Sequence, residues 1–273
     1  MAENDDISPI FEGWPYHPRK ISARKILGDD GLPKVQMRLD LGLIQMELVG
    51  RPDGVRPNDH ESLLEFYANQ LTEYKLKHGS DLGFELSPAD CRELRDEALM
   101  YYHRYLACFV LEEYEQVIQD TQRNLQVFDL CNRYAAKKSD RMILEQYRPY
   151  VIMMNTRAKA QLAAKHSDYS EAIKQIKAGL RAIKKIYDDI DQPEEFHASF
   201  EASILRQLGR RMRRKLPADP LKTLEKKLLR AVNEDRFEDA AHLRDQIARI
   251  KKAKDADPNT DQPTDRGQDS QDE

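Results

Sequence analysis

Residues 221–252 read LKTLEKKLLRAVNEDRFEDAAHLRDQIARIKK, and this stretch predicts two short helices joined by a polar turn. In each half, apolar residues recur at three- and four-residue spacing, the seam pattern of a coiled coil. They are Leu221, Leu224, Leu228 and Ala231, followed by Phe237, Ala240, Leu243, Ile247 and Ile250. Asn233–Asp235 forms the polar turn, and Ala240 and Ala241 leave room for a close helix crossing.

A hairpin of this length is too small to bury its own apolar surface. Folds below about 40 residues usually need a disulfide, a metal or a partner, and this segment contains no cysteine. We therefore expect its seam to be covered by the rest of the chain, by a second copy or by another protein. Pro217 and Pro220 interrupt the chain and predict a linker over residues 216–220, which favours a separate module over residues 221–252.

The same stretch resembles the UVR motif of the UvrB and UvrC excision-nuclease subunits, of ClpC-type unfoldases and of McsA-type adaptors. The resemblance rests on Leu224-Glu225, Leu228 and Ala231, and on the string Phe237-Glu238-x-Ala240-Ala241-x-Leu243-Arg244-Asp245-x-Ile247. Asp235 stands where the excision subunits favour leucine, and an acidic turn is more similar to the adaptors and unfoldases.

The resemblance implies a helical hairpin that pairs with another UVR hairpin or a related surface. Its apolar positions would make the contact, and Glu238, Arg244 and Asp245 would set the geometry through ion pairs. The implied partner-binding residues are Leu224, Leu228, Ala231, Phe237, Glu238, Ala240, Ala241, Leu243, Arg244, Asp245 and Ile247.

Sequence features of an enzyme are missing from the chain. There is no G-x-x-x-x-G-K-[ST] loop, so the ATP-driven engines of those relatives are not expected. The seven histidines are scattered, and Cys91, Cys108 and Cys131 are far apart, without the CxxC zinc pairs of the McsA type. Such cysteines predict reduced thiols in a cytoplasm. We expect no catalytic residue, no metal, no cofactor and no enzymatic activity.

Upstream of the hairpin, the sequence predicts a mainly α protein with an N-terminal arm and β-ribbon over residues 1–58. Val35 and Met37 begin an alternating apolar pattern, which resumes in the opposite phase at Ile44 and Met46. This switch predicts a bulge at Gly42. Gln45, Glu47, Arg51 and Asp53 are candidates for a polar binding edge of the ribbon, and core packing is the alternative.

Helical spacing begins near Asp59 and predicts a helical body over residues 59–215. The expected helices cover 59–79, 87–111, 113–136, 139–165 with a kink or a restart at Pro149, 168–187 and 193–215. Ala160, Tyr169, Ala172 and Gly179 resemble one tetratricopeptide unit, but a weaker echo at Tyr114 does not follow at that family's ~34-residue period. The body is thus either an antiparallel helical bundle or tetratricopeptide-like.

Charge is distributed unevenly along the 273 residues, although the net charge is only −4. Residues 204–230 contain ten Lys/Arg against two acids, whereas residues 255–273 contain seven acids and one arginine. This asymmetry predicts an acidic disordered tail over residues 253–273. A candidate nucleic-acid stripe consists of Arg206, Arg210, Arg211, Arg213 and Arg214. The alternatives are cations that oppose the dipole at a solvated helix end, and an intramolecular partner for the acidic tail.

These features predict a cytoplasmic, non-catalytic adaptor. No signal peptide and no apolar run near ~20 residues is visible, so no membrane association is expected. The hairpin would dock a protein partner, such as another UVR-containing protein, or form a homodimer. The alternative is a DNA-repair accessory of an excision nuclease that contacts DNA through residues 206–215. A stress-response regulator of a protease or unfoldase would differ from the adaptor only in its partner.

Overall fold

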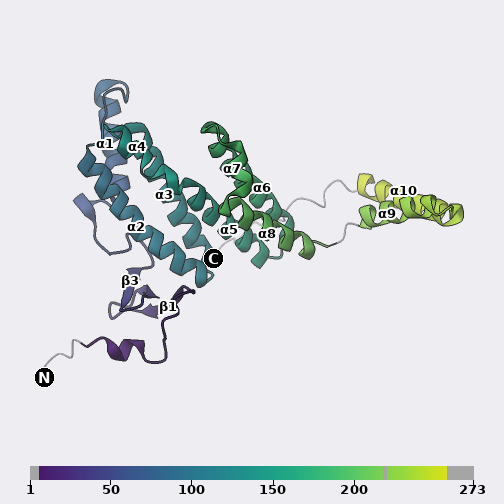
Figure 1. The fold of residues 1–273 in the computed structure, drawn as a ribbon, viewed down its shortest axis with the longest axis horizontal. Helices are drawn as coiled ribbons and strands as arrows, with labels where there is room; N and C mark the ends of the chain where they lie inside the picture. The colour runs from purple at the N-terminus through teal and green to yellow at the C-terminus, as the bar shows by residue number, and fades with distance from the viewer. Residues whose placement is uncertain (1–5, 218–219, 257–273) are drawn as a thin grey trace, which may run out of the picture. The chain divides into compact units, whose positions relative to one another are not determined.

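The computed structural model describes residues 6–217 and 220–256, and the chain divides after Lys215 into two compact units (Figure 1). The first unit contains a small sheet and a helical body. The second contains a helical hairpin, and it is described by itself. The mainly α fold with a small N-terminal sheet is confirmed. Within the described ranges, no helix is long and apolar enough to cross a membrane.

A three-stranded antiparallel sheet of order β1-β2-β3 begins the first unit. Its strands are β1 (Ser22–Leu27), β2 (Pro33–Arg38) and β3 (Leu43–Glu47). The predicted bulge at Gly42 is wrong, because a hairpin turn reverses the chain there and the Leu39 N–H donates to the Gly42 carbonyl at 2.9 Å. The reversal pairs Val35 with Met46, so both phases of the apolar pattern lie on one face of the sheet.

The body begins after the sheet and is helical throughout. Its helices are α1 (Leu63–His78), α2 (Pro88–Val110), α3 (Tyr114–Tyr134), α4 (Lys138–Met142), α5 (Arg148–Lys165), α6 (Tyr169–Asp189), α7 (Pro193–Ala198) and α8 (Phe200–Lys215). Short 3-10 turns lie at Ser8–Phe11, Pro57–Asp59 and Glu145–Tyr147.

Local sequence sets most of these helix ends. Ser87 and Asp90 form a reciprocal capping box at the start of α2, and the Asp168 side chain caps α6. Gly79 ends α1 in the left-handed conformation. The interruption predicted at Pro149 is confirmed, because residues 139–165 contain α4 and α5, and α5 begins at Arg148. The helix predicted over residues 193–215 is divided into α7 and α8, with a break at Ser199.

Successive helices pack on one another through small residues. α3 packs on α2 and α5, and α6 packs on α5 and α8. Ala160 and Ala172 are fully buried, and a Cβ on Gly179 would lie 2.1 Å from the Thr156 hydroxyl. The one-unit resemblance therefore marks a close crossing of α5 and α6. The sheet contributes Val35 to the same core, which explains how so small a ribbon stays folded.

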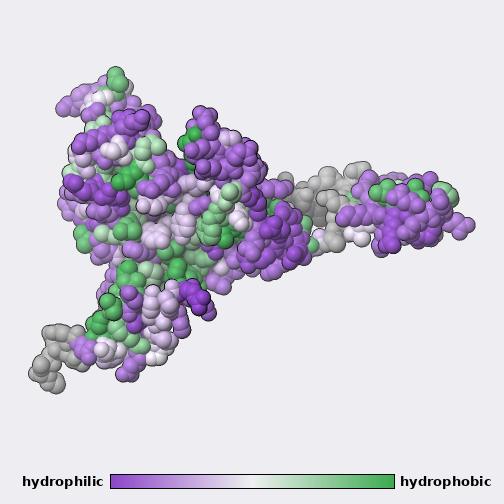
Figure 2. Space-filling model, viewed as in Figure 1, coloured by the Kyte–Doolittle hydropathy of each residue, from purple (hydrophilic) through white to green (hydrophobic). Residues whose placement is uncertain are grey.

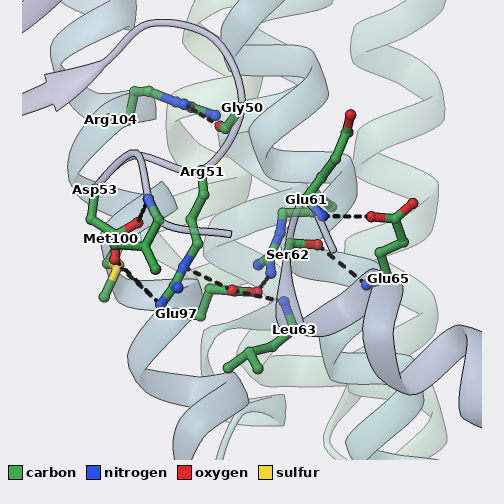
Figure 3. Close-up of polar contacts among 12 residues, drawn as sticks. Gly50, Arg51, Asp53, Glu61, Ser62, Leu63, Glu65, Glu97, Met100 and Arg104 are labelled. Carbon is green, nitrogen blue, oxygen red and sulfur yellow. Dashed lines mark hydrogen bonds and ion pairs between the residues drawn. The ribbon is translucent and has the colours of Figure 1, made fainter. Parts of the chain in front are cut away.

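The segment between β3 and α1 is held on the helices by a buried carboxylate (Figure 3). Glu97 of α2 is 1% exposed, pairs with Arg51 at 3.0 Å and also with Arg123 of α3, and accepts the Leu63 backbone N–H at 2.9 Å. Of the proposed binding edge, Gln45 accepts from Gln36, Glu47 pairs with Lys34, and Asp53 pairs with Arg51. These four polar residues therefore have partners within the unit, which supports the core-packing alternative.

The second unit consists of α9 (Pro220–Asn233) and α10 (Phe237–Ala256), which pack against each other. The turn between them closes where the Arg236 N–H donates to the Ala231 carbonyl at 2.8 Å. The acidic disordered tail predicted over residues 253–273 is wrong for residues 253–256, which belong to α10, and from residue 257 onward it lies outside the described residues.

Candidate docking hairpin

The inner seam of the hairpin is covered by its own two helices. Ala231 of α9 and Ala240 and Ile247 of α10 are 1%, 8% and 7% exposed. Leu224, Leu228 and Leu243 are half-buried. The expectation that this seam needs an outside cover is therefore wrong for its central residues, because each helix covers the other. Ala240 lies at the helix crossing, whereas Ala241 is exposed.

The exposed apolar residues lie on the outer side of the hairpin. Leu229, Val232 and Phe237 are 63%, 44% and 67% exposed, and we call them the outer apolar side. Figure 2 shows hydrophobic residues gathered along one edge of a hairpin that is otherwise hydrophilic. Phe237 was predicted to lie in the inner seam. Its exposure shows that this prediction is wrong at the first residue of α10.

An ion pair shows that these three side chains lie on one side. Glu225 of α9 and Lys251 of α10 are joined at 3.2 Å, so the flanks that carry them face the same way. Leu229 and Val232 follow Glu225 by one and two helical turns, and Phe237 precedes Lys251 by about four turns. Sequence reasoning missed Leu229 and Val232. The signal that could have found them is their three-residue spacing, one position after the seam residues Leu228 and Ala231.

The opposite side of the hairpin is polar and holds a shallow hollow of ≈ 370 Å³. It is lined by Lys227, Arg230, Arg236, Asp239, His242 and Leu243. Arg236 pairs with Glu234 at 2.8 Å and with Asp239 at 2.7 Å, and Arg230 pairs with Glu234 at 2.8 Å. Hydrogen bonds from Arg230 and Arg236 lower the pKa of Glu234. These charges hold the turn, and the two sides of the hairpin thus differ in chemistry.

The implied geometry-setting residues lie in the open. Glu238 is exposed, and Arg244 pairs with its neighbour Asp245 at 3.0 Å, not with the other helix. Asp235 adopts a left-handed backbone with φ 56°. Asp enters this conformation more readily than a residue with a bulky aliphatic side chain. The left-handed backbone of the turn therefore suits the aspartate at this position.

The candidate nucleic-acid stripe on α8 is interrupted at its first member. The Arg206 guanidinium donates to the carbonyls of His197 at 3.0 Å and Phe196 at 3.3 Å, and it lies over the Phe196 ring. It therefore caps α7. Exposed side chains follow at Arg210, Arg211, Arg213 and Arg214, and across residues 6–217 and 220–256 none of these four has a carboxylate partner.

The fold brings two of the three cysteines together, because the side chains of Cys91 and Cys131 are hydrogen-bonded to each other. In the part of the chain that the structure describes, no three His, Cys, Asp or Glu side chains are grouped to hold a metal ion. Cys91, Cys108 and Cys131 are buried and unbonded to one another by disulfides. The absence of enzymatic activity stays a prediction.

Comparison with known proteins bears on the hairpin alone. No curated protein and no solved structure matches the chain. Residues 219–253 match the family model described as the UvrB/uvrC motif. This range spans α9 and most of α10, including the seam, the turn and the outer apolar side. The C-terminal helical hairpin of this protein is therefore a UVR motif.

Proposed function

We propose that this protein is a non-catalytic adaptor that docks a partner protein through the outer apolar side of its UVR hairpin. The observation that supports this is the exposure of Leu229, Val232 and Phe237 on one side of a unit whose inner seam is already filled. Grouped large apolar side chains on a surface mark interaction sites. Burying a side chain of this kind contributes about 1.5–3 kcal/mol.

The partner in this proposal is a second UVR hairpin. It belongs either to another UVR-containing cytoplasmic protein or to a second copy of this chain, in which case the same side meets itself across a twofold axis. Apolar surface on both partners would be removed from water together. Excision-nuclease subunits and stress-linked unfoldases carry such hairpins, so the choice among partners decides between roles in DNA repair and in proteolysis.

The test compares two full-length variants. Val232→Ser with Phe237→Ser removes apolar area from exposed positions and leaves the seam intact. We expect at least 10-fold weaker binding to a purified UVR-containing protein from the same host, measured by surface plasmon resonance. Self-association is measured by sedimentation velocity over a range of concentrations. Leu76→Ser is the matched control, because Leu76 is 83% exposed on α1. Unchanged binding and self-association in the double variant would refute the proposal.

A second candidate function is DNA contact by an excision-nuclease accessory. It is favoured by four exposed arginines of α8 that pair with no carboxylate among the described residues: Arg210, Arg211, Arg213 and Arg214. Duplex binding at ~50 mM salt with a steep salt dependence would support it. Arg213→Ala with Arg214→Ala should then weaken binding to all sequences alike and flatten the salt dependence. No duplex binding at that salt concentration removes this candidate.

A further inference from the structure

Arginines inside the first unit are matched by oxygen acceptors, with one exception. Arg104 pairs with Asp120, Arg51 and Arg123 pair with Glu97, and Arg148 pairs with Glu145. Half-buried arginines outside these pairs bond to carboxylate, amide or carbonyl oxygens; they are Arg24, Arg38, Arg95 and Arg206. Arg157 of α5 is the exception, because in the described ranges its guanidinium forms no ion pair with a carboxylate, and the oxygen groups that interact with it are the hydroxyls of Tyr150 and Tyr114.

The groups next to the Arg157 guanidinium are an aromatic ring and a sulfur atom. Its guanidinium lies 4.3 Å from the centre of the Phe109 ring, and Nη1 is 3.3 Å from the sulfur of Met154. A thioether is only a weak acceptor. A half-buried cation with no anion beside it is costly, and most such groups in proteins are paired. Tyr150, Met154, Arg157 and Gln161 recur at four- and three-residue spacing, so they share one face of α5.

A second cation lies beside Arg157. Ile204, Leu208 and Arg211 share the face of α8 at four- and three-residue spacing, and Ile204 and Leu208 belong to the core that α5 and α8 form together. This spacing directs Arg211 to the α5 side of α8. Burial lowers the pKa of Arg157; the hydroxyl groups of Tyr150 and Tyr114 oppose this, and the charge of Arg211 lowers the pKa further. Two guanidinium groups therefore lie near each other without a carboxylate of the described chain between them.

We propose that Arg157 and Arg211 form an anion site on the helical body that takes a carboxylate of an acidic peptide segment in a second partner protein. The inference rests on the proposed adaptor function, because it names the second docking site that an adaptor requires. Two guanidinium groups suit a carboxylate, since each offers a planar fork of donors.

The neighbours of the pair favour a peptide over a nucleic acid. Phe109, Tyr150 and Ile204 are half-buried beside the cations, so apolar side chains of a peptide have surfaces to contact. A DNA backbone instead needs cations repeated along an open stripe, and that stripe is broken where Arg206 bonds to the carbonyls that end α7. The Glu201 carboxylate, which acts on the pKa of Tyr150, forms no ion pair with Arg157.

Fluorescence anisotropy of the full-length protein tests the site. The probe is a fluorescein-labelled eight-residue peptide of alternating Glu and Leu, and its Gln–Leu counterpart reports binding without charge. We expect Arg157→Gln and Arg211→Gln each to weaken Glu–Leu binding at least 10-fold. Arg210→Gln is the matched control, because Arg210 is exposed one residue away on another face of α8; it should change binding less than 2-fold.

Stability gives a second readout. Replacing a half-buried cation that has no carboxylate partner among the described residues should leave the melting temperature of Arg157→Gln unchanged or raise it, so weaker binding does not arise from unfolding. Four results would each overturn the site. The first three are no Glu–Leu binding, equal loss in Arg210→Gln, and equal binding of the Gln–Leu peptide. The fourth is displacement of the labelled peptide by millimolar inorganic phosphate, or by duplex DNA, at a lower concentration than the unlabelled Glu–Leu peptide requires.

The hairpin variants separate this site from the docking proposal. Val232→Ser with Phe237→Ser should bind the Glu–Leu peptide as the unchanged chain does, because its arginines are intact. Arg157→Gln should still bind the UVR-containing partner. Loss of peptide binding in the hairpin variant would contradict a site on the body, whereas loss of hairpin docking alone would leave the anion site standing.

Discussion

Arg104 of α2 and Asp120 of α3 are joined by two hydrogen bonds inside the first unit. The Nε and Nη2 groups of Arg104 donate to the two carboxylate oxygens at 2.9 and 2.7 Å, and both side chains are 2% exposed. The remaining Nη1 donates to the carbonyls of Glu47 at 3.0 Å and Gly50 at 2.6 Å. One guanidinium thus ties two helices to the end of the sheet.

Removing the carboxylate of this pair should be costly. Asp120→Ala leaves the Arg104 charge buried without its partner, which typically costs about 3–5 kcal/mol. Urea unfolding followed by circular dichroism should show this as a lower midpoint. Asp188→Ala removes the exposed partner of Lys184 and is the control; it should cost less than about 1 kcal/mol. Equal midpoints for the two variants would show that the buried pair contributes little.

The two helical glycines of the body should respond in opposite directions to alanine. A Cβ on Gly179 would lie 2.1 Å from the Thr156 hydroxyl, so Gly179→Ala must push α5 and α6 apart. Overpacking of this kind costs about 1–3 kcal/mol. A Cβ on Gly209 would meet Ile176 at 3.4 Å, an ordinary contact. Gly209→Ala should therefore be neutral or stabilise by up to about 1 kcal/mol, because alanine favours helix.

Thermal unfolding of both alanine variants measures this difference. The melting temperature should fall for Gly179→Ala and stay or rise for Gly209→Ala. A fall of the same size in both would mean that the crossing of α5 and α6 is no tighter than that of α6 and α8.

The cysteines should resist labelling in the folded protein. Burial raises the pKa of Cys108 and of Cys131 to about 12 and also raises the pKa of Cys91. A raised pKa means that the thiol stays protonated at pH 8, and only the thiolate is a strong nucleophile. Ellman's reagent at pH 8 should react only slowly with the native chain. In urea, by contrast, it should react with all three thiols. Rapid reaction without urea would contradict the buried positions.

Adjacent alanines of the hairpin provide a test of its inner seam. Ala240→Glu places a carboxylate at a position that is 8% exposed between α9 and α10, whereas Ala241→Glu places it at an exposed position. A buried, unpaired carboxylate is strongly unfavourable. Hydrogen exchange of residues 220–252 in the full-length chain should therefore lose protection in Ala240→Glu and change less than about 2-fold in Ala241→Glu. Similar exchange in both variants would place the helix crossing elsewhere.

Local signals in the sequence were sufficient for most element boundaries. The Ser87-Pro88 pair and Asp168 fixed the starts of α2 and α6, because capping depends on a few neighbouring residues. At Gly42 the same reasoning failed. An alternation that changes phase is equally consistent with a bulge and with a reversed second strand, and only pairing between strands distinguishes them.

The candidate site shows the same division. The residue string of the UVR motif was sufficient to identify the hairpin, since the spacing of apolar residues and the acidic turn are local properties. The residue string was not sufficient to identify which apolar residues remain exposed. Phe237 and Ala240 look alike in a seam pattern, but one is 67% and the other 8% exposed. The rotation of α10 about its own axis separates them, and packing against α9 sets that rotation.

The sequence by itself determined where most helices begin and end, which segment is the UVR hairpin and how charge is distributed along the chain. The tertiary structure decided which charges are matched. Arg104 and Asp120 are sixteen residues apart and meet only because α2 and α3 pack together. Arg157 and Arg211 are farther apart in sequence, and only the packing of α5 on α8 lets the charge of Arg211 act on Arg157, while neither forms an ion pair with a carboxylate of the described residues. Compensation of charge is a relation between distant residues, so it depends on the packed fold.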